Sequence, residues 1–237
     1  LKQVSLELGG KSPQVVLSDA PELEMVAQAI ATGIFFNQGE VCSAGSRLLV
    51  HRAVKDELLD LVVEAARRTV VGDPLDPRTT VGALVEEQHL ERVLEHVRGA
   101  CDDGAQTVLG GSRTLAETGG YYLEPTIFDR VEAGMRIARQ EIFGPVLSVL
   151  TFEDTDEAVR IANGTDYGLA AAVWTKDLSS AHRMSRAIRA GTVWVNCFDE
   201  SDITVPFGGY AQSGFGRDKS LHALDKYTQL KTTWIKL

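Results

Sequence analysis

The sequence of 237 residues is poor in the residues that build metal and disulfide sites. Its three cysteines, Cys42, Cys101 and Cys197, are an odd number at wide spacings, which fits neither a disulfide framework nor a CxxC metal site. The five histidines form no HExxH pair. His89 and His96 recur at helical spacing among Glu and Arg residues, which predicts a solvated helix face. We therefore expect no metal site.

Long apolar runs and an excess of basic residues are also missing. No uninterrupted apolar run approaches the roughly 18 to 20 residues that span a bilayer, and no basic N-terminal region leads into an apolar segment. The formal net charge of -9 argues against a nucleic-acid surface. With 44% hydrophobic and 24% charged residues, the composition is that of a soluble globular protein. We predict a cytoplasmic protein that has neither a membrane nor nucleic acid as a partner.

Strand-like and helical patterns alternate along the chain. Apolar residues at helical spacing predict helices over 23–34, 54–67, 85–101, 155–162, 179–188 and 219–227. Short apolar runs predict strands over 14–17, 48–51, 107–109, 146–152, 170–174 and 192–195. This alternation predicts an α/β fold with a largely parallel sheet and flanking helices. Residues 232–237 alternate like an edge strand, which favours pairing with another subunit.

One cysteine stands among small and polar residues in the stretch FFNQGEVCSAGSR, residues 35–47. Gly39 is expected to end the preceding helix, so that Cys42 lies on an accessible turn. The neighbouring glycines leave room for a tetrahedral oxyanion, and backbone N–H groups at the turn favour the reactive thiolate. A cysteine is also often a small buried hydrophobe. The stretch alone leaves a nucleophile and a core residue both open.

A second candidate lies in the stretch LELGGKSP, residues 6–13. Glu7 belongs to an alternating, strand-like run that ends at a Gly-Gly pair. A carboxylate at the end of a strand points into the space where α/β proteins keep their ligands. Taken alone, Glu7 is better interpreted as a solvated or paired surface acid.

Together these two stretches resemble the active-site signatures of the aldehyde dehydrogenase superfamily, whose members oxidise aldehydes to acids with NAD(P). The resemblance continues in family order through QEIFGPV at 140–146, GTVWVN at 191–196, PFGGY at 206–210 and SGFGR at 213–217. It implies that Cys42 attacks the aldehyde and that Glu7 activates water to hydrolyse the resulting thioester. It also implies that Glu141 bonds the nicotinamide ribose and that Phe143 packs beside the nicotinamide ring.

The resemblance covers only the catalytic half of the family's pattern. It implies that residues 1–10 are the last strand of a cofactor-binding domain, that 11–207 form the catalytic domain, and that 208–237 form a returning segment with an oligomerisation strand. The phosphate loop, the adenosine pocket and an amide donor to the oxyanion are not recognisable here. We therefore expect NAD or NADP as cofactor with most of its binding site outside this chain, a chain that is inactive alone, and a homodimer or homotetramer.

A finer resemblance concerns the substrate. Residues 202–209 and 216–224 resemble the branch that acts on γ-glutamyl-γ-aminobutyraldehyde and related aminoaldehydes of polyamine breakdown. Asp199, Glu200 and Asp202 would suit a substrate that carries an ammonium or guanidinium group near the channel mouth. An ordinary acidic loop has the same composition.

Two readings from other function classes also stay open. One is a non-catalytic fragment or oligomerisation module, supported by the apolar C-terminal run. The other is a cofactor-independent thiol esterase that uses Cys42 and Glu7 alone.

Overall fold

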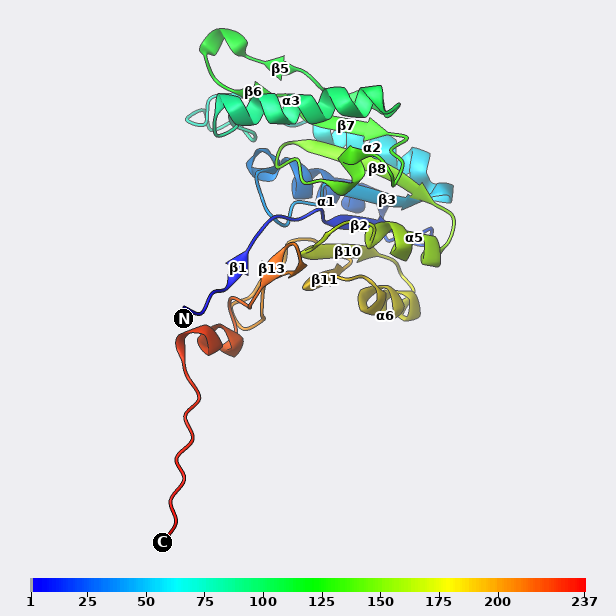
Figure 1. Cartoon of the computed structure of the whole chain (residues 1–237). Coiled ribbons are helices and arrows are strands. Elements are labelled where there is room, and N and C mark those ends of the chain that lie inside the picture. Colours follow the sequence, from blue (N-terminus) through cyan, green and yellow to red (C-terminus); the bar gives the residue numbers. More distant parts are fainter. Residues whose placement is uncertain (1) are drawn as a thin grey trace.

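A seven-stranded sheet lies at the centre of the computed structural model, which describes residues 2–237 (Figure 1). The strand order is β11-β10-β2-β3-β8-β7-β4, and every neighbouring pair is parallel except the edge pair β4 and β7. The predicted α/β fold with a largely parallel sheet is therefore confirmed. The strands are β2 (Pro13–Val16), β3 (Arg47–His51), β4 (Gln106–Leu109), β7 (Thr126–Asp129), β8 (Val146–Phe152), β10 (Ala170–Trp174) and β11 (Thr192–Val195).

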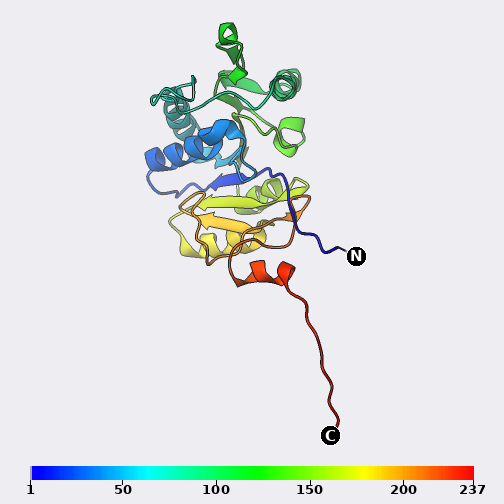
Figure 2. The ribbon, with the colours of Figure 1, turned by 90° about the vertical axis from the view of Figure 1, so that its left-hand side faces the viewer.

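Helices cover both faces of this sheet (Figure 2). One face carries α1 (Leu23–Phe35) and α2 (Lys55–Arg67). The other carries α3 (Glu87–Asp102), α4 (Arg136–Arg139), α5 (Thr155–Ala162) and α6 (Leu178–Ala187). Side chains alternate along the strands. Val16 therefore packs on the face covered by α1 and α2, and Val15 packs on the face covered by α3 to α6. Burial on both faces explains why these strands are almost continuous apolar runs in the sequence.

Several short elements lie outside the seven-stranded sheet, and sequence periodicity did not reveal most of them because two residues cannot establish a period. β1 and β13 pair antiparallel, as do β9 with β12 and β5 with β6. Their bounds are β1 (Leu6–Glu7), β5 (Arg113–Thr114), β6 (Tyr122–Leu123), β9 (Tyr167–Gly168), β12 (Tyr210–Ala211) and β13 (Gly214–Phe215). The 3-10 helices are η1 (Phe36–Gly39), η2 (Arg52–Val54), η3 (Ala116–Thr118) and η4 (Leu221–Tyr227).

The C-terminal residues differ from their prediction. The helix predicted over 219–227 is present as the 3-10 helix η4. Residues 228–237 are exposed, have no strand assignment, and extend away from the body of the protein (Figures 1 and 2). The predicted edge strand does not form in the single chain, because a strand needs a neighbour with which to pair. Its pairing with another subunit stays a prediction. Within residues 2–237, no helix has both the length and the apolar character that crossing a membrane requires.

Candidate active site

Three adjacent strands begin where the predicted site residues lie. Residues 9–12 lead into β2, residues 42–46 lead into β3, and residues 141–145 lead into β8. Because these strands are parallel neighbours, the three segments meet at the amino ends of the strands. Open α/β sheets usually bind ligands at the carboxyl ends. The argument made for Glu7 from the end of a strand therefore does not describe this sheet, and Glu7 belongs to β1, outside it.

The glycine pair between β1 and β2 separates two of the predicted site residues. A Cβ atom on Gly10 would lie 2.3 Å from the carbonyl oxygen of Cys42, and one on Gly9 would lie 1.9 Å from Oε2 of Glu141. The Gly10 N–H donates to Oε1 of Glu141 at 3.0 Å. At Gly10 the obstacle is backbone, so only glycine fits there, whereas at Gly9 it is the end of the Glu141 side chain. Cys42 and Glu141 therefore both pack against the Gly9–Gly10 segment that leads into β2.

Cys42 lies on a turn after η1 as a half-buried free thiol, as the position of Gly39 predicted. Burial raises the pKa of the thiol above its ordinary value, and the carboxylates of Glu7 and Glu141 raise it further. The backbone N–H groups of Ser43 and Cys42 lower the pKa, but burial outweighs them. The backbone contribution expected from the sequence is therefore present without being dominant. Gly10 contacts both the Cys42 carbonyl oxygen and the Glu141 carboxylate, and Glu7 lies three residues before Gly10 on the same segment, so the three predicted residues belong to adjoining segments.

Glu7 faces residues from the far end of the chain. Its Oε1 lies 3.0 Å from the Cβ position of Gly208. Although the residue as a whole is exposed, partial burial raises the pKa of its carboxyl group, and the negative charge of Asp218 raises it further. Lys226 and Arg217 lower this pKa. A raised pKa makes the carboxylate a stronger base near neutral pH. None of these charged neighbours was predicted from the sequence.

Glu141 and Phe143 lie on the loop between α4 and β8. Burial raises the pKa of Glu141, whereas the Gly10 N–H and the charge of Lys11 lower it. Phe143 has a φ of +57°, which is rare for a non-glycine residue, and it is 39% exposed. A carboxylate that keeps an oxygen beyond the Gly10 bond can accept a ribose hydroxyl, and an exposed aromatic ring can pack beside a planar ring. These two residues therefore fit the nicotinamide half of the cofactor.

Two basic residues, Lys11 and Arg47, are buried at the starts of β2 and β3. The Arg47 guanidinium donates to the carbonyl oxygens of Lys11, Ile161 and Ala162 at 2.9, 2.9 and 2.7 Å. It thereby joins the start of β2 to the end of α5. The Lys11 ammonium has no hydrogen-bond partner among residues 2–237. Burial, followed by the charge of Arg47, lowers the pKa of Lys11 to about 7, while Glu141 opposes the shift.

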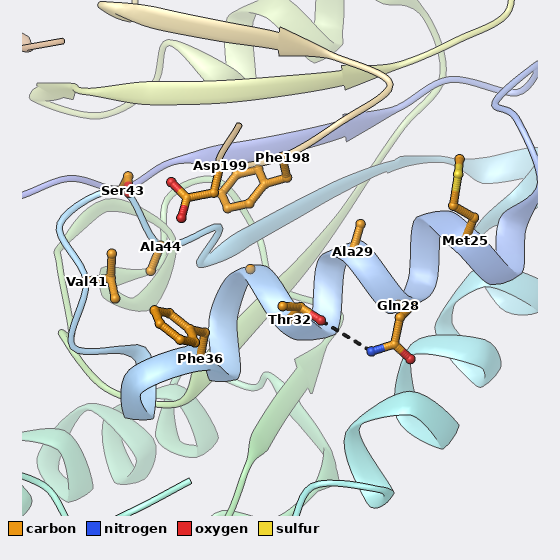
Figure 3. Close-up of a pocket in the computed structure, with 11 residues that line it drawn as sticks. Met25, Gln28, Ala29, Thr32, Phe36, Val41, Ser43, Ala44, Phe198 and Asp199 are labelled. Carbon is orange, nitrogen blue, oxygen red and sulfur yellow. Dashed lines mark hydrogen bonds between the residues drawn. The ribbon is translucent and has the colours of Figure 1, made fainter. Parts of the chain in front are cut away.

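A cavity of about 420 Å³ opens beside the Cys42 turn (Figure 3). Its walls come from one side of α1, from the turn and from the segment after β11, and most of the lining residues are apolar. Asp199 contributes a carboxylate, whose pKa burial raises while Lys219 and Ser43 lower it. Glu200 and Asp202 do not line this cavity. The lining residues are Met25, Gln28, Ala29, Thr32, Gly33, Phe36, Val41, Ser43, Ala44, Phe198 and Asp199.

The structure contradicts the solvated face predicted for His89 and His96. His89 is 5% exposed, and its Nε2 lies 2.6 Å from the carbonyl oxygen of Phe143. His96 is half-buried, and burial lowers its pKa to about 4. A sequence signal was available, because His89 is four residues before Val93, on the apolar stripe of α3. The prediction was wrong because histidine was counted as a polar, exposed residue, whereas His89 is buried.

Comparison with known proteins identifies the family. Residues 1–233 match the aldehyde dehydrogenase family. The chain is 50% identical over 237 residues to the NADP/NAD-dependent aldehyde dehydrogenase PuuC of Escherichia coli, a match that covers 100% of this chain and 47% of that protein. It is 50% identical over 236 residues to aminoacetaldehyde dehydrogenase of Pseudomonas aeruginosa, covering 99% of this chain and 47% of that protein.

A solved structure agrees with this match. The crystal structure of the aldehyde dehydrogenase KauB from Pseudomonas aeruginosa superposes with a TM-score of 0.98 at 63% identity, over 100% of this chain and 48% of that chain. The chain spans about half the length of the curated relatives that it matches. On the extent of the family match and on this superposition, the chain belongs to the aldehyde dehydrogenase family.

Proposed function

We propose that the gene product carrying this chain oxidises aldehydes to carboxylic acids with NAD or NADP, and that Cys42 is its nucleophile and Glu7 its base. The observation that carries this proposal is the meeting of three segments at the amino ends of adjacent parallel strands: the segment with Cys42, the segment with Glu141, and the glycine pair that follows Glu7. Gly10 packs against the Cys42 carbonyl oxygen and donates to Glu141, so these segments are in direct contact. Membership of the aldehyde dehydrogenase family supports the reaction class. The relative PuuC is named as an enzyme that uses NADP or NAD.

The residues of this chain suit two successive steps on one sulfur atom. The Cys42 thiol gives its proton to a base, and the sulfur attacks the aldehyde carbon, so that a C–S bond forms and the carbonyl electrons move to oxygen. Backbone N–H groups at the turn, which already lower the pKa of the thiol, would donate to the developing oxyanion. When it is bound, the nicotinamide supplies the acceptor for the hydride, and a thioester then remains on Cys42. Glu7 takes a proton from water, which attacks the thioester and breaks the C–S bond, so that the acid leaves.

Glu141 and Phe143 would hold the nicotinamide end of the cofactor. The Glu141 carboxylate, oriented by the Gly10 N–H, would accept hydrogen bonds from the ribose, and the Phe143 ring would pack beside the nicotinamide. We propose that most other cofactor contacts lie outside residues 1–237, so that this chain alone binds NAD(P) weakly and turns over little. Calorimetry on the 237-residue chain tests this proposal, and tight NAD binding would contradict it.

We further propose that the substrate is an aldehyde bearing a positive charge. Asp199 places a carboxylate in a largely apolar cavity beside Cys42, and one relative is named aminoacetaldehyde dehydrogenase. In the whole gene product, Asp199→Asn should lower kcat/KM for aminoaldehydes roughly tenfold, which corresponds to about 1.4 kcal/mol. The same change should leave plain aliphatic aldehydes unaffected. Equal efficiency of the unmutated protein on both substrate classes would contradict this assignment.

The exposed tail supports an oligomer. Leu230, Trp234 and Leu237 are exposed on the segment that leaves the body of the chain. We propose that this segment pairs with another subunit in a homodimer or homotetramer. Light scattering of the gene product with and without residues 228–237 tests the proposal, since an unchanged mass would rule out a role for the tail.

The reaction class itself is tested by formation of NADH from an aldehyde and NAD, in the whole gene product and in its Cys42→Ser variant. We expect oxidation that the variant loses. Hydrolysis of a chromogenic ester without NAD, in the absence of any NAD-linked oxidation, would instead favour the thiol esterase. No Cys42-dependent reaction at all would favour the non-catalytic module.

A further inference from the structure

His89, in the first turn of α3, contacts both loops of the candidate active site. Its Nε2 lies 2.6 Å from the carbonyl oxygen of Phe143 and 3.5 Å from Oε1 of Glu40, two residues before Cys42. Its ring also packs edge-on against the Phe143 ring, with the ring centroids 6.1 Å apart. The side chain is almost fully buried, so these contacts take the place of water. His89 therefore joins the nucleophile loop to the loop that carries the predicted cofactor residues.

The neighbours of His89 fix which ring nitrogen carries the proton. A carbonyl oxygen only accepts hydrogen bonds, so the short contact to Phe143 assigns a proton to Nε2. Nη2 of Arg92 lies 3.3 Å from Nδ1, and a guanidinium only donates, so Nδ1 is the acceptor. The neutral Nε2–H tautomer satisfies both partners. His89 thus donates in one fixed direction, toward the Phe143 loop.

Both loops need such support because their backbones are strained. Asn37 and Gln38 have φ values of +49° and +58°, and Phe143 has a φ of +57°. Non-glycine residues keep this conformation only where the surrounding structure holds them. The loops also touch directly, because a Cβ on Gly39 would lie 2.2 Å from the carbonyl oxygen of Gly144.

The segment before His89 holds the nucleophile loop as well. The Gly82 N–H donates to Oε1 of Gln38 at 2.9 Å, and the Val85 N–H donates to Oε1 of Glu40 at 3.1 Å. These bonds hold the Cys42 loop against residues 82–85, which precede α3. His89, in α3, contacts the Phe143 loop, so α3 and the residues before it support both loops.

We propose that His89 is a positioning residue that sets the distance between the Cys42 loop and the Phe143 loop, and thereby the distance between the thiol and the nicotinamide ring. This inference rests on the proposed dehydrogenase function. Without the Nε2–H donor, the part-buried hydrogen bond to the Phe143 carbonyl is lost and the strained loop can relax. A shift of about 1 Å between reacting groups can cost roughly 100-fold in rate. Hydride transfer is therefore the step that loss of His89 should slow.

Two substitutions in the whole gene product separate this role from simple packing. His89→Leu keeps apolar volume without a donor. His89→Gln keeps an N–H₂ group for the Phe143 carbonyl and an oxygen for Arg92. Amide hydrogen exchange should become about tenfold faster over residues 37–42 and 141–144 in the leucine variant, and should stay near the wild-type rate in the glutamine variant. Exchange in α6 is the internal control. Wild-type protection of both loops in His89→Leu would overturn the inference.

The catalytic consequence is measured with an aldehyde deuterated at its carbonyl carbon. In His89→Leu, kcat should fall about tenfold or more and the primary isotope effect on kcat should grow, with little change in the KM for aldehyde. His89→Gln should restore both values. An unchanged isotope effect in His89→Leu, or equal losses in both variants, would overturn the role in catalysis. If the unmutated protein shows no NAD-linked oxidation, the proposed function fails, while hydrogen exchange still decides whether His89 holds the loops.

Discussion

Replacing Gly10 with alanine perturbs the contact that positions the Cys42 main chain. The added Cβ would lie 2.3 Å from the carbonyl oxygen of Cys42, about 1 Å closer than ordinary van der Waals contact. Both sides of this contact are backbone, so neither can rotate away and the Cys42 turn has to move. Displacement by about 1 Å can cost roughly 100-fold in rate, and overpacking a dense region costs about 1–3 kcal/mol of stability.

We therefore expect Gly10→Ala in the whole gene product to lower kcat/KM for aldehyde roughly 100-fold and the free energy of unfolding by about 1–3 kcal/mol. NADH formation and urea unfolding measure the two effects. Alkylation by iodoacetamide, resolved by peptide mass so that Cys42 is separated from Cys101 and Cys197, should show a changed rate at Cys42. Wild-type activity and a wild-type alkylation rate in this variant would refute the reasoning.

Substitutions at two other glycines, Gly9 and Gly99, serve as matched controls. In Gly9→Ala the Cβ would meet Oε2 of Glu141, the end of a side chain that can rotate away. The KM for NAD should then rise roughly tenfold, as the loss of about 1.4 kcal/mol of binding would cause, while the Cys42 alkylation rate stays unchanged. Gly99, in α3, has nothing within 4 Å of an added Cβ. Gly99→Ala should raise stability by about 0.5–1 kcal/mol and leave activity unchanged.

Three further expectations concern charge. Arg47→Met removes three hydrogen bonds to buried carbonyl oxygens, of which the Ile161 oxygen keeps the Gly164 N–H as a donor, and should lower the free energy of unfolding by about 3 kcal/mol. Wild-type stability in urea would show that the guanidinium does not stabilise the fold. Burial and two carboxylates raise the pKa of Cys42 above its ordinary value of 9.0, so its alkylation rate should still increase with pH above that value. Glu7→Gln removes one of the carboxylates and should move this increase to lower pH. A move to higher pH would contradict the contribution of Glu7 to the raised pKa. Asp218→Asn removes a negative charge that raises the pKa of Glu7, so the acid limb of the pH profile of kcat should move to lower pH. An acid limb at the wild-type pH would show that Asp218 does not affect the pKa of Glu7.

Most of the central sheet could be predicted from the sequence because its strands are buried on both faces. Such burial makes β3 and β8 mostly apolar, and the amphipathic helices α2 and α5 begin within one residue of their predicted starts. β7 was missed although it is fully buried, and its antiparallel partner β4 shows no sign of direction in the sequence. Strand direction depends on pairing, which local periodicity does not encode.

The candidate site was predictable only in part. The Cys42 turn follows in part from local signals, since Gly39 is the last residue of η1 and small residues follow it. The helix α1 itself ends four residues earlier, at Phe35, which the glycine did not predict. The surroundings of Glu7 depend on the pairing of β1 with β13, which joins residues more than 200 positions apart. His89 lies on the buried stripe of α3 because the Phe143 carbonyl offers it a partner there, and a single sequence gives no sign of such a partner.

The most direct test is the mass of the Glu7→Gln gene product after it has been mixed with an aldehyde and NAD. Without a base to activate water, we predict an acyl adduct on Cys42 that accumulates together with about one NADH per site, and that is absent when NAD is omitted or when Cys42 is serine. Steady turnover without an adduct, or an acyl group on a different residue, would contradict the assignment of Cys42 and Glu7.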